Sequence, residues 1–202
     1  MKLLRNGAFL VIAIASQTAT AAIDPASKSM GPVALTPTLN VQTGYDDNIF
    51  SATTAETDSL ITTISPTVQI IAEDGYNAYR VQYQLIKGIY DSSSDDNYLD
   101  QNLSFDAHME FSARSKLDLS AAYAQKHEDR GTGVSETGGV ASGLDSPLEY
   151  DTKSLSFIYN YGATDATGRI VFAGRIIDKE YQNFRSITEQ RDTDQTTLGL
   201  TF

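Results

Sequence analysis

The chain has 202 residues, no Cys, no Trp and a formal net charge of −11. Without cysteine it has no disulfide scaffold, thiolate metal site or cysteine nucleophile, and its acidic balance argues against nucleic acid as a partner. The 11 Tyr and 8 Phe favour strands over helices.

The first 22 residues differ from the rest of the chain. Lys2 and Arg5 precede an apolar run over residues 8–15, and small residues follow it. This order is typical of a secretory signal peptide, and the apolar run is too short for a membrane anchor. We therefore expect residues 1–22 to be removed on export, and a buried N-terminal helix is the less favoured alternative.

Residues 23–32 contain Ala, Ser and Pro and are expected to form a flexible periplasmic lead-in. From residue 33 onward, apolar and polar side chains alternate over long runs, most clearly over residues 79–85 and 102–111. Because side chains on a strand change face at each residue, each run has one apolar and one polar face. Strands that cross a bilayer need roughly 9–11 residues, whereas strands of soluble proteins have about 5–6. The pattern is typical of a transmembrane β-barrel.

Eight such runs follow one another along the chain, over residues 33–45, 60–70, 79–85, 102–111, 117–123, 155–161, 170–177 and 196–202. The connections between them are alternately long and short, as in outer-membrane barrels. The long connections follow Tyr45, Tyr90, Lys126 and Tyr181, and the short ones lie at Asp74, Arg114 and Asp165. A soluble sandwich explains the alternation but neither the length of the runs nor the order of the loops.

We therefore predict an all-β fold, an antiparallel up-and-down transmembrane β-barrel over residues 33–202. The tyrosines near the long connections are expected to form an aromatic girdle; they are Tyr45, Tyr90, Tyr123, Tyr150 and Tyr181.

Polar side chains on one face of the runs are candidates to line the lumen. They are Arg80, Gln82, Asp106, His108, Glu110, Asp118 and Arg175, together with Lys126 and Lys179. An eight-stranded barrel is filled by its own side chains, whereas roughly 16 strands leave an aqueous channel. Two alternatives remain open. Either Phe202 is the natural end and the chain forms a complete narrow barrel, or the chain is cut there and is the first half of a wider barrel, which we favour.

Other kinds of site are weaker interpretations. His108 lies between Asp106 and Glu110 in the sequence, but no nucleophile pattern accompanies it, so we expect a hydrogen-bond network rather than an enzyme. Acidic residues near the long connections, such as Asp95 and Asp96, lack the spacing of a calcium loop and are expected to form a solvated rim. No catalytic residue, metal or cofactor is predicted.

The segment that closes the first run contains Tyr45, Asp46, Asp47 and Asn48. Together with the Asp-Ser pair at 58–59 and the acidic segment 95–100, it resembles the outer-membrane β-barrel porins linked to exopolysaccharide or capsule export (the EpsL-like group). The resemblance covers residues 41–202, although members of that group are usually much longer chains. The last alternating residues, Leu198 to Phe202, are similar to the C-terminal signal that barrel-assembly machinery reads.

The resemblance implies a protein of the Gram-negative cell outer membrane that acts as a porin-like conduit in exopolysaccharide or capsule export. Its implied partners are outer-membrane lipid, barrel-assembly machinery, the polysaccharide and periplasmic export proteins. Transport would be diffusion through a polar lumen, gated by the long loop over residues 128–149. The alternative is a small closed barrel with a structural or adhesive role and no channel activity.

Overall fold

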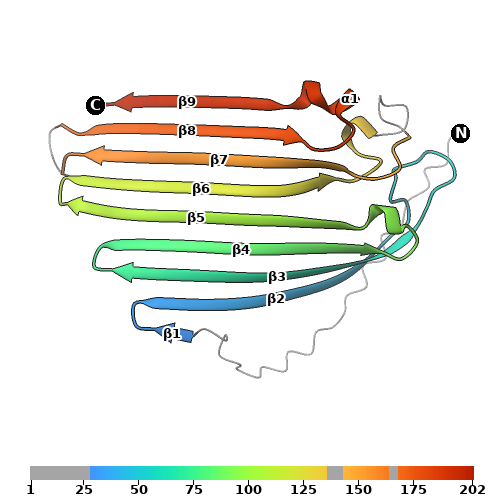
Figure 1. Cartoon of the computed structure of the whole chain (residues 1–202), viewed down its shortest axis with the longest axis horizontal. Helices are drawn as coiled ribbons and strands as arrows, with labels where there is room; N and C mark the ends of the chain where they lie inside the picture. Colours follow the sequence, from blue (N-terminus) through green and yellow to red (C-terminus); the bar gives the residue numbers. More distant parts are fainter. Residues whose placement is uncertain (1–27, 136–142, 164–167) are drawn as a thin grey trace, which may run out of the picture.

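A computed structural model describes residues 28–135, 143–163 and 168–202, and their strands form one antiparallel sheet. Each strand pairs with the strands before and after it in the sequence, so the sheet is an up-and-down meander (Figure 1). This confirms the predicted all-β, antiparallel up-and-down fold. The predicted signal peptide lies outside the described residues.

The sheet consists of one short strand and eight long ones. The strands are β1 (Lys28–Met30), β2 (Val33–Asp46), β3 (Ser59–Asp74), β4 (Asn77–Tyr90), β5 (Tyr98–Ser112), β6 (Ser115–Glu128), β7 (Leu148–Tyr161), β8 (Ile170–Tyr181) and β9 (Thr193–Thr201). Four short helical segments lie in the connections: η1 (Ser94–Asp96), η2 (Gly133–Ser135), α1 (Arg185–Thr188) and η3 (Glu189–Arg191). In the described part of the chain, no helix has the length and apolar character needed to cross a membrane.

The connections divide the sheet into two ends. The loops over residues 47–58, 91–97, 129–147 and 182–192 lie at one end, which we call the loop end. The connections over residues 31–32, 75–76, 113–114 and 162–169 lie at the other, the turn end, and each is shorter than the loops next to it in the sequence. The predicted alternation of long and short connections is therefore confirmed. Residues 136–142 and 164–167 are outside the described part.

Strand pairing separates the side chains into a polar face and an apolar face. One row across the sheet contains Arg80, Asp106, Ser120, Ser156 and Arg175, and defines the polar face. The adjacent row, on the apolar face, contains Tyr79, Ala107, Leu119, Phe157, Gly174 and Leu198. Gly174 is buried beneath the Phe157 ring, which covers the space that a side chain would fill.

Almost nothing covers either face of this single layer. Among the described residues, the only buried hydrophobic side chains are Ala107, Leu148 and Tyr181, whereas large side chains such as Leu103 and Phe172 are exposed on the apolar face. A soluble protein buries such a surface, and a membrane protein presents it to lipid.

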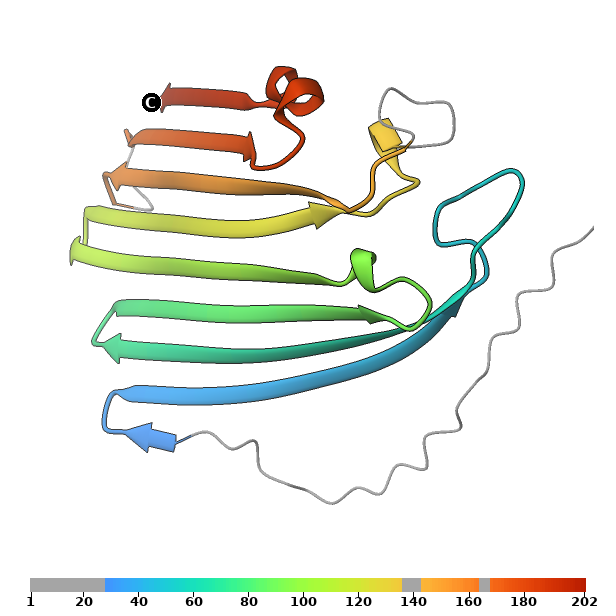
Figure 2. The ribbon, with the colours of Figure 1, turned by 45° about the vertical axis from the view of Figure 1, so that its right-hand side comes forward.

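The two edges of the sheet are open. Strands β2 and β9 lie at opposite edges in both views (Figures 1 and 2), so the sheet is not closed into a barrel in this structure. Strand β1 covers β2 only at Val33, Ala34 and Leu35. Three residues of the expected flexible lead-in thus form a strand, because the turn at Gly31, with a φ of 70°, folds them back onto β2.

Candidate functional site

An ion pair on the polar face joins neighbouring strands. The Arg80 guanidinium on β4 donates to Asp106 Oδ2 on β5 from Nη2 at 2.8 Å and from Nε at 3.1 Å. Ser120 Oγ on β6 donates to the other carboxylate oxygen at 2.8 Å. The three residues meet because the strand register places them side by side in one row.

A second network lies one row closer to the turn end. The His108 ring nitrogens contact two carboxylates: Nδ1 lies 2.6 Å from Asp118 Oδ1, and Nε2 lies 3.5 Å from Glu110 Oε1. Lys116 Nζ donates to the same Glu110 oxygen. From the sequence we expected Asp106 and Glu110 to flank His108, but Asp118 replaces Asp106 as its partner. Directly opposed residues on paired strands are closer than residues two apart on one strand.

The remaining lumen candidates are also on the polar face. Gln82 Oε1 accepts a hydrogen bond from Gln69 Nε2 at 3.2 Å, and Arg175 lies at the far end of the Arg80 row. The side chains of Arg80 and Asp106 are 51% and 36% exposed. Water therefore reaches the polar face directly, and Arg80 and Asp106 are paired there.

Three of the tyrosines expected in an aromatic girdle are on this face instead. The register places Tyr45 and Tyr123 on the apolar face, as a girdle requires. Tyr90, Tyr150 and Tyr181 lie on the polar face, and Tyr181 is only 1% exposed. The girdle prediction is wrong for these three, because the strand register places their side chains on the polar face and a girdle requires them on the apolar face.

His127, at the loop end of β6, lies between two carboxylates. Its Nδ1 is 2.8 Å from Asp100 Oδ1 and its Nε2 is 3.0 Å from Asp129 Oδ1. Both nitrogens can donate only in the protonated imidazole, so this geometry selects the charged ring. The ring also stacks on Tyr98, with 3.6 Å between centroids. A Cβ on Gly88 would lie 2.1 Å from the Tyr98 ring, so glycine is required there.

Glu128, the next residue, binds strand β8 and the loop that follows it. Its carboxylate accepts hydrogen bonds from Tyr181 Oη at 2.5 Å, Arg191 Nη1 at 2.9 Å and Lys179 Nζ at 3.3 Å. The Lys179 ammonium also lies 3.8 Å from the centroid of the Tyr150 ring. Strands β6, β7 and β8 are therefore joined at this point to the loop over residues 182–192.

Arg130 extends in the opposite direction, over the first two loops. Its Nε donates to Asp96 Oδ1 at 2.6 Å, and Asp96 is only 4% exposed. Its guanidinium carbon lies 4.4 Å from the centroid of the Phe50 ring. A Cβ on the adjacent Gly131, whose φ is 81°, would lie 2.1 Å from the Phe50 carbonyl oxygen. The third loop therefore packs closely against the first.

We call residues 127–130 the loop-end clasp, because they contact elements on both sides of β6. The hydrogen bond from the His127 ring is the main cause that lowers the pKa of the Asp129 carboxyl below its usual value. The described residues at the base of the expected gating loop are thus held in place, and residues 136–142 of that loop lie outside the described part. The sequence analysis missed the clasp, although the run His-Glu-Asp-Arg directly after an alternating strand was a visible signal.

The motif that carried the family resemblance shapes the first loop. The Asn48 backbone N–H donates to Asp46 Oδ1 at 2.9 Å, and the Asn48 side chain makes two hydrogen bonds of 2.8 Å with the Ala52 backbone. Tyr45 Oη donates to Asp58 Oδ2 at 2.9 Å, across the base of the loop, and Asp47 is exposed. These contacts fold the loop and so position Phe50, two residues beyond the motif, against Arg130.

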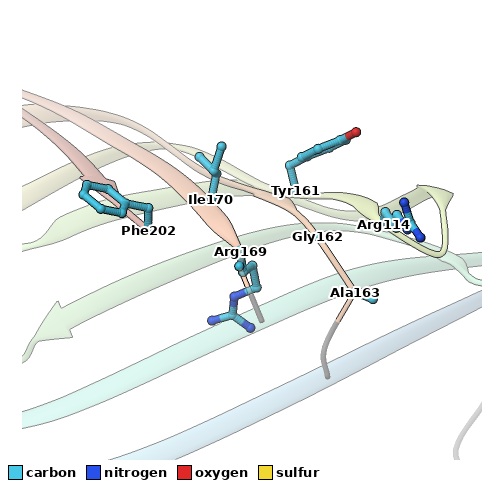
Figure 3. A pocket seen from close by; sticks show the side chains of 8 residues that line it. Arg114, Tyr161, Gly162, Ala163, Arg169, Ile170 and Phe202 are labelled. Atoms are coloured by element: carbon cyan, nitrogen blue, oxygen red, sulfur yellow. The ribbon is translucent and has the colours of Figure 1, made fainter. Parts of the chain in front are cut away.

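Two cavities lie at the ends of the sheet. The one at the turn end has a volume of about 750 Å³, and Tyr161 and Ile170 point to the opposite side of the ribbon from Arg169 there (Figure 3). Ala163 and Gly168 also line it. The cavity at the loop end, about 310 Å³, lies where the pairing of β5 and β6 stops at Gln101 and Gln125.

Over the described ranges, no three His, Asp or Glu side chains are arranged to hold a metal ion.

A long up-and-down antiparallel sheet with one apolar and one charged face is the wall of a β-barrel. Residues 21–202 match the family described as "Putative beta-barrel porin 2", and the chain belongs to this family. No curated protein and no solved structure matches the chain.

Proposed function

We propose that the protein is part of a water-filled conduit in the outer membrane, through which exported polysaccharide diffuses. The observation that carries this proposal is the open polar face. Arg80, Asp106 and Ser120 form a continuous hydrogen-bonded row on it, and water reaches this row. Membership of a β-barrel porin family supports the same function at a coarser level.

The extent of the apolar face fits a sheet that crosses a bilayer. On β5 the apolar side chains extend from Leu103 to Phe111, and Gln101 follows toward the loop end. On β7 and β8 the same face becomes charged at Lys153 and Asp178, which lie 3.8 Å apart. A span of roughly 9–11 tilted residues crosses the hydrocarbon. The loop-end clasp would thus lie outside the lipid, on the cell surface.

The chemistry of the polar face suits a hydroxylated polymer. Amides, hydroxyls and carboxylates all occur on it, and several of its charges have an opposite neighbour, as Arg80 has Asp106. Such a wall offers hydrogen-bond donors and acceptors to sugar hydroxyls, without a strong electrostatic potential of a single sign. Polysaccharide synthesis and periplasmic export proteins would supply the direction of transport.

Planar bilayers test this proposal. The purified protein should give stable single-channel steps, and neutral oligosaccharides added to one side should block the current reversibly. The matched control is the same measurement with a small sugar alcohol, which should pass without discrete blocks. If several preparations insert but give no steps, the alternative of a closed structural or adhesive barrel replaces the conduit.

A further inference from the structure

The cavity of about 310 Å³ at the loop end lies between two strands in the middle of the sheet (Figure 1). Strands β5 and β6 stop pairing at Gln101 and Gln125, although β5 begins at Tyr98 and β6 continues to Glu128. Over these residues β5 stays paired with β4, and β6 stays paired with β7. The two strands therefore separate from each other while each keeps its other neighbour. We call the space at this gap the loop-end cavity.

The side chain of His127 reaches across the gap and leaves a neighbouring lysine without a partner. Continued pairing would place Asp100 opposite Lys126, one position beyond the last pair of β5 and β6. Instead, the Asp100 carboxylate accepts a hydrogen bond from His127 Nδ1 at 2.8 Å. In the described part of the chain, the Lys126 ammonium has neither an ion-pair partner nor a hydrogen bond, and the residue is exposed.

Two further polar groups that line the loop-end cavity have no partner among the described residues. They are the carboxylate of Glu149, an exposed residue near the start of β7, and the hydroxyl of Tyr150, which is half-buried. By contrast, the nearby carboxylates of Glu128 and Asp129 accept hydrogen bonds from Arg191 and the His127 ring. The cavity therefore has an open ammonium, an open carboxylate and an open phenol around one small space.

The charges around the cavity indicate a neutral ligand. A phosphate or sulfate group would meet the carboxylates of Asp100, Glu149 and Asp151. A cation would meet the Lys126 ammonium and the protonated ring of His127. The open ammonium needs an acceptor and the open carboxylate needs a donor. A hydroxyl group both donates and accepts, so a neutral ligand with several hydroxyls satisfies both.

The size and the remaining lining of the cavity fit a sugar ring. Its volume is at the lower end of the range for small-molecule pockets, about 300–1,000 Å³. The rings of Tyr98 and Tyr150 and the side chain of Leu99 supply apolar surface for the C–H groups of such a ring, and the amides of Gln125 and Gln182 add further hydrogen-bonding groups.

We propose that the loop-end cavity binds one neutral sugar unit, whose hydroxyls accept from the Lys126 ammonium and donate to the Glu149 carboxylate. The inference rests on the proposed conduit, which it deepens by naming a polymer-binding site at the cell-surface end. Glycan head groups of outer-leaflet lipid carry the same hydroxyls, so the test distinguishes these two sources.

Isothermal titration calorimetry tests the site on the full chain, in a detergent without a sugar head group because a glycosidic detergent would compete. The probes are neutral tetrasaccharides of glucose, galactose, mannose or N-acetylglucosamine. At least one should bind. Lys126→Met and Glu149→Gln should each weaken its binding about tenfold, through the loss of a hydrogen bond to a charged group. The matched control, Glu189→Gln, removes an exposed loop-end carboxylate outside the cavity and should leave the affinity unchanged.

Lipopolysaccharide added during the same titration identifies the source of the sugar. If it displaces the bound tetrasaccharide, the site binds lipid glycans. If tetrasaccharide binding is unchanged, the site binds the exported polymer. Either result supports a sugar site in the loop-end cavity.

Other results would overturn the inference. The site is refuted if no tetrasaccharide binds the folded protein. It is also refuted if Lys126→Met and Glu149→Gln, folded as judged by circular dichroism, bind the sugar as tightly as the unaltered protein. A protein that binds the sugar but forms no channels would refute the conduit and leave the site standing. Channels formed by a protein that binds no sugar would refute the site alone, so the two failures are distinguishable.

Discussion

Removal of the Arg130 guanidinium should loosen the whole loop end. The buried Asp96 carboxylate, which is 4% exposed, relies on Arg130 for its charge partner. Removing one partner of a buried ion pair costs about 3–5 kcal/mol. The Arg130 side chain is itself 19% exposed, which favours the low end of this range. The lost contact with Phe50 adds about 0.5–1 kcal/mol. We therefore expect Arg130→Ala to lower the free energy of local opening by about 3.5–4 kcal/mol.

Hydrogen exchange measured by mass spectrometry on the protein in lipid vesicles checks this value, because it reports local opening of the segment over residues 91–97. Arg130→Lys keeps the charge but loses the planar fork, so its loss should be smaller, about 1.5 kcal/mol. The double variant Asp96→Asn with Arg130→Ala should be less destabilised than Arg130→Ala alone, because no unpaired carboxylate remains buried. The ion-pair explanation would be refuted if the destabilisation of the double variant equalled the sum of the two single effects. It would also be refuted if Arg130→Ala left hydrogen exchange unchanged.

Three further changes test the loop end. Gly88→Ala should displace the Tyr98 ring and destabilise the protein by about 1–3 kcal/mol in urea titrations, whereas Gly44→Ala, with nothing near its Cβ, should be close to neutral. Glu128→Gln leaves a buried tyrosine and two cations without their carboxylate, and should increase protease cleavage in the loop over residues 182–192 more than cleavage at the turn end. The lowered pKa of Asp129 means that this carboxylate stabilises the fold above its unfolded pKa of about 4. That contribution is lost as the pH falls through the lower folded value. Exchange at residues 129–131 should therefore rise below about pH 4, and Asp129→Asn should already exchange faster at neutral pH and show a smaller rise. An equal rise in both proteins would contradict this assignment.

The properties that depend on the two-residue period could be predicted from the sequence. Tyr79 and Arg80 point to opposite faces of β4, and Asp106 and Ala107 to opposite faces of β5, whichever register the strands adopt. The positions of the short and long connections follow from the same pattern. These predictions needed only local information, and the structure confirmed them.

Properties that depend on register or on contacts between loops could not be predicted. Asp118 is ten residues from His108, and only the β5–β6 pairing shows that they are partners. Arg130 meets Phe50 and Asp96 from loops far apart in the sequence. No local pattern records such contacts, which is why the sequence did not predict that the base of the loop over residues 128–149 is anchored.

The central claim is that the polar face lines a water-filled conduit, and ion selectivity in planar bilayers tests it most directly. The reversal potential under a salt gradient reports the charge of the wall. Arg80→Gln should make the pore more cation-selective, and Asp106→Asn more anion-selective, while Val81→Ala on the apolar face should change nothing. Opposite shifts for the first two variants are the result that we expect. If neither substitution changes the ion selectivity of the channels, this face does not line the path of the ions.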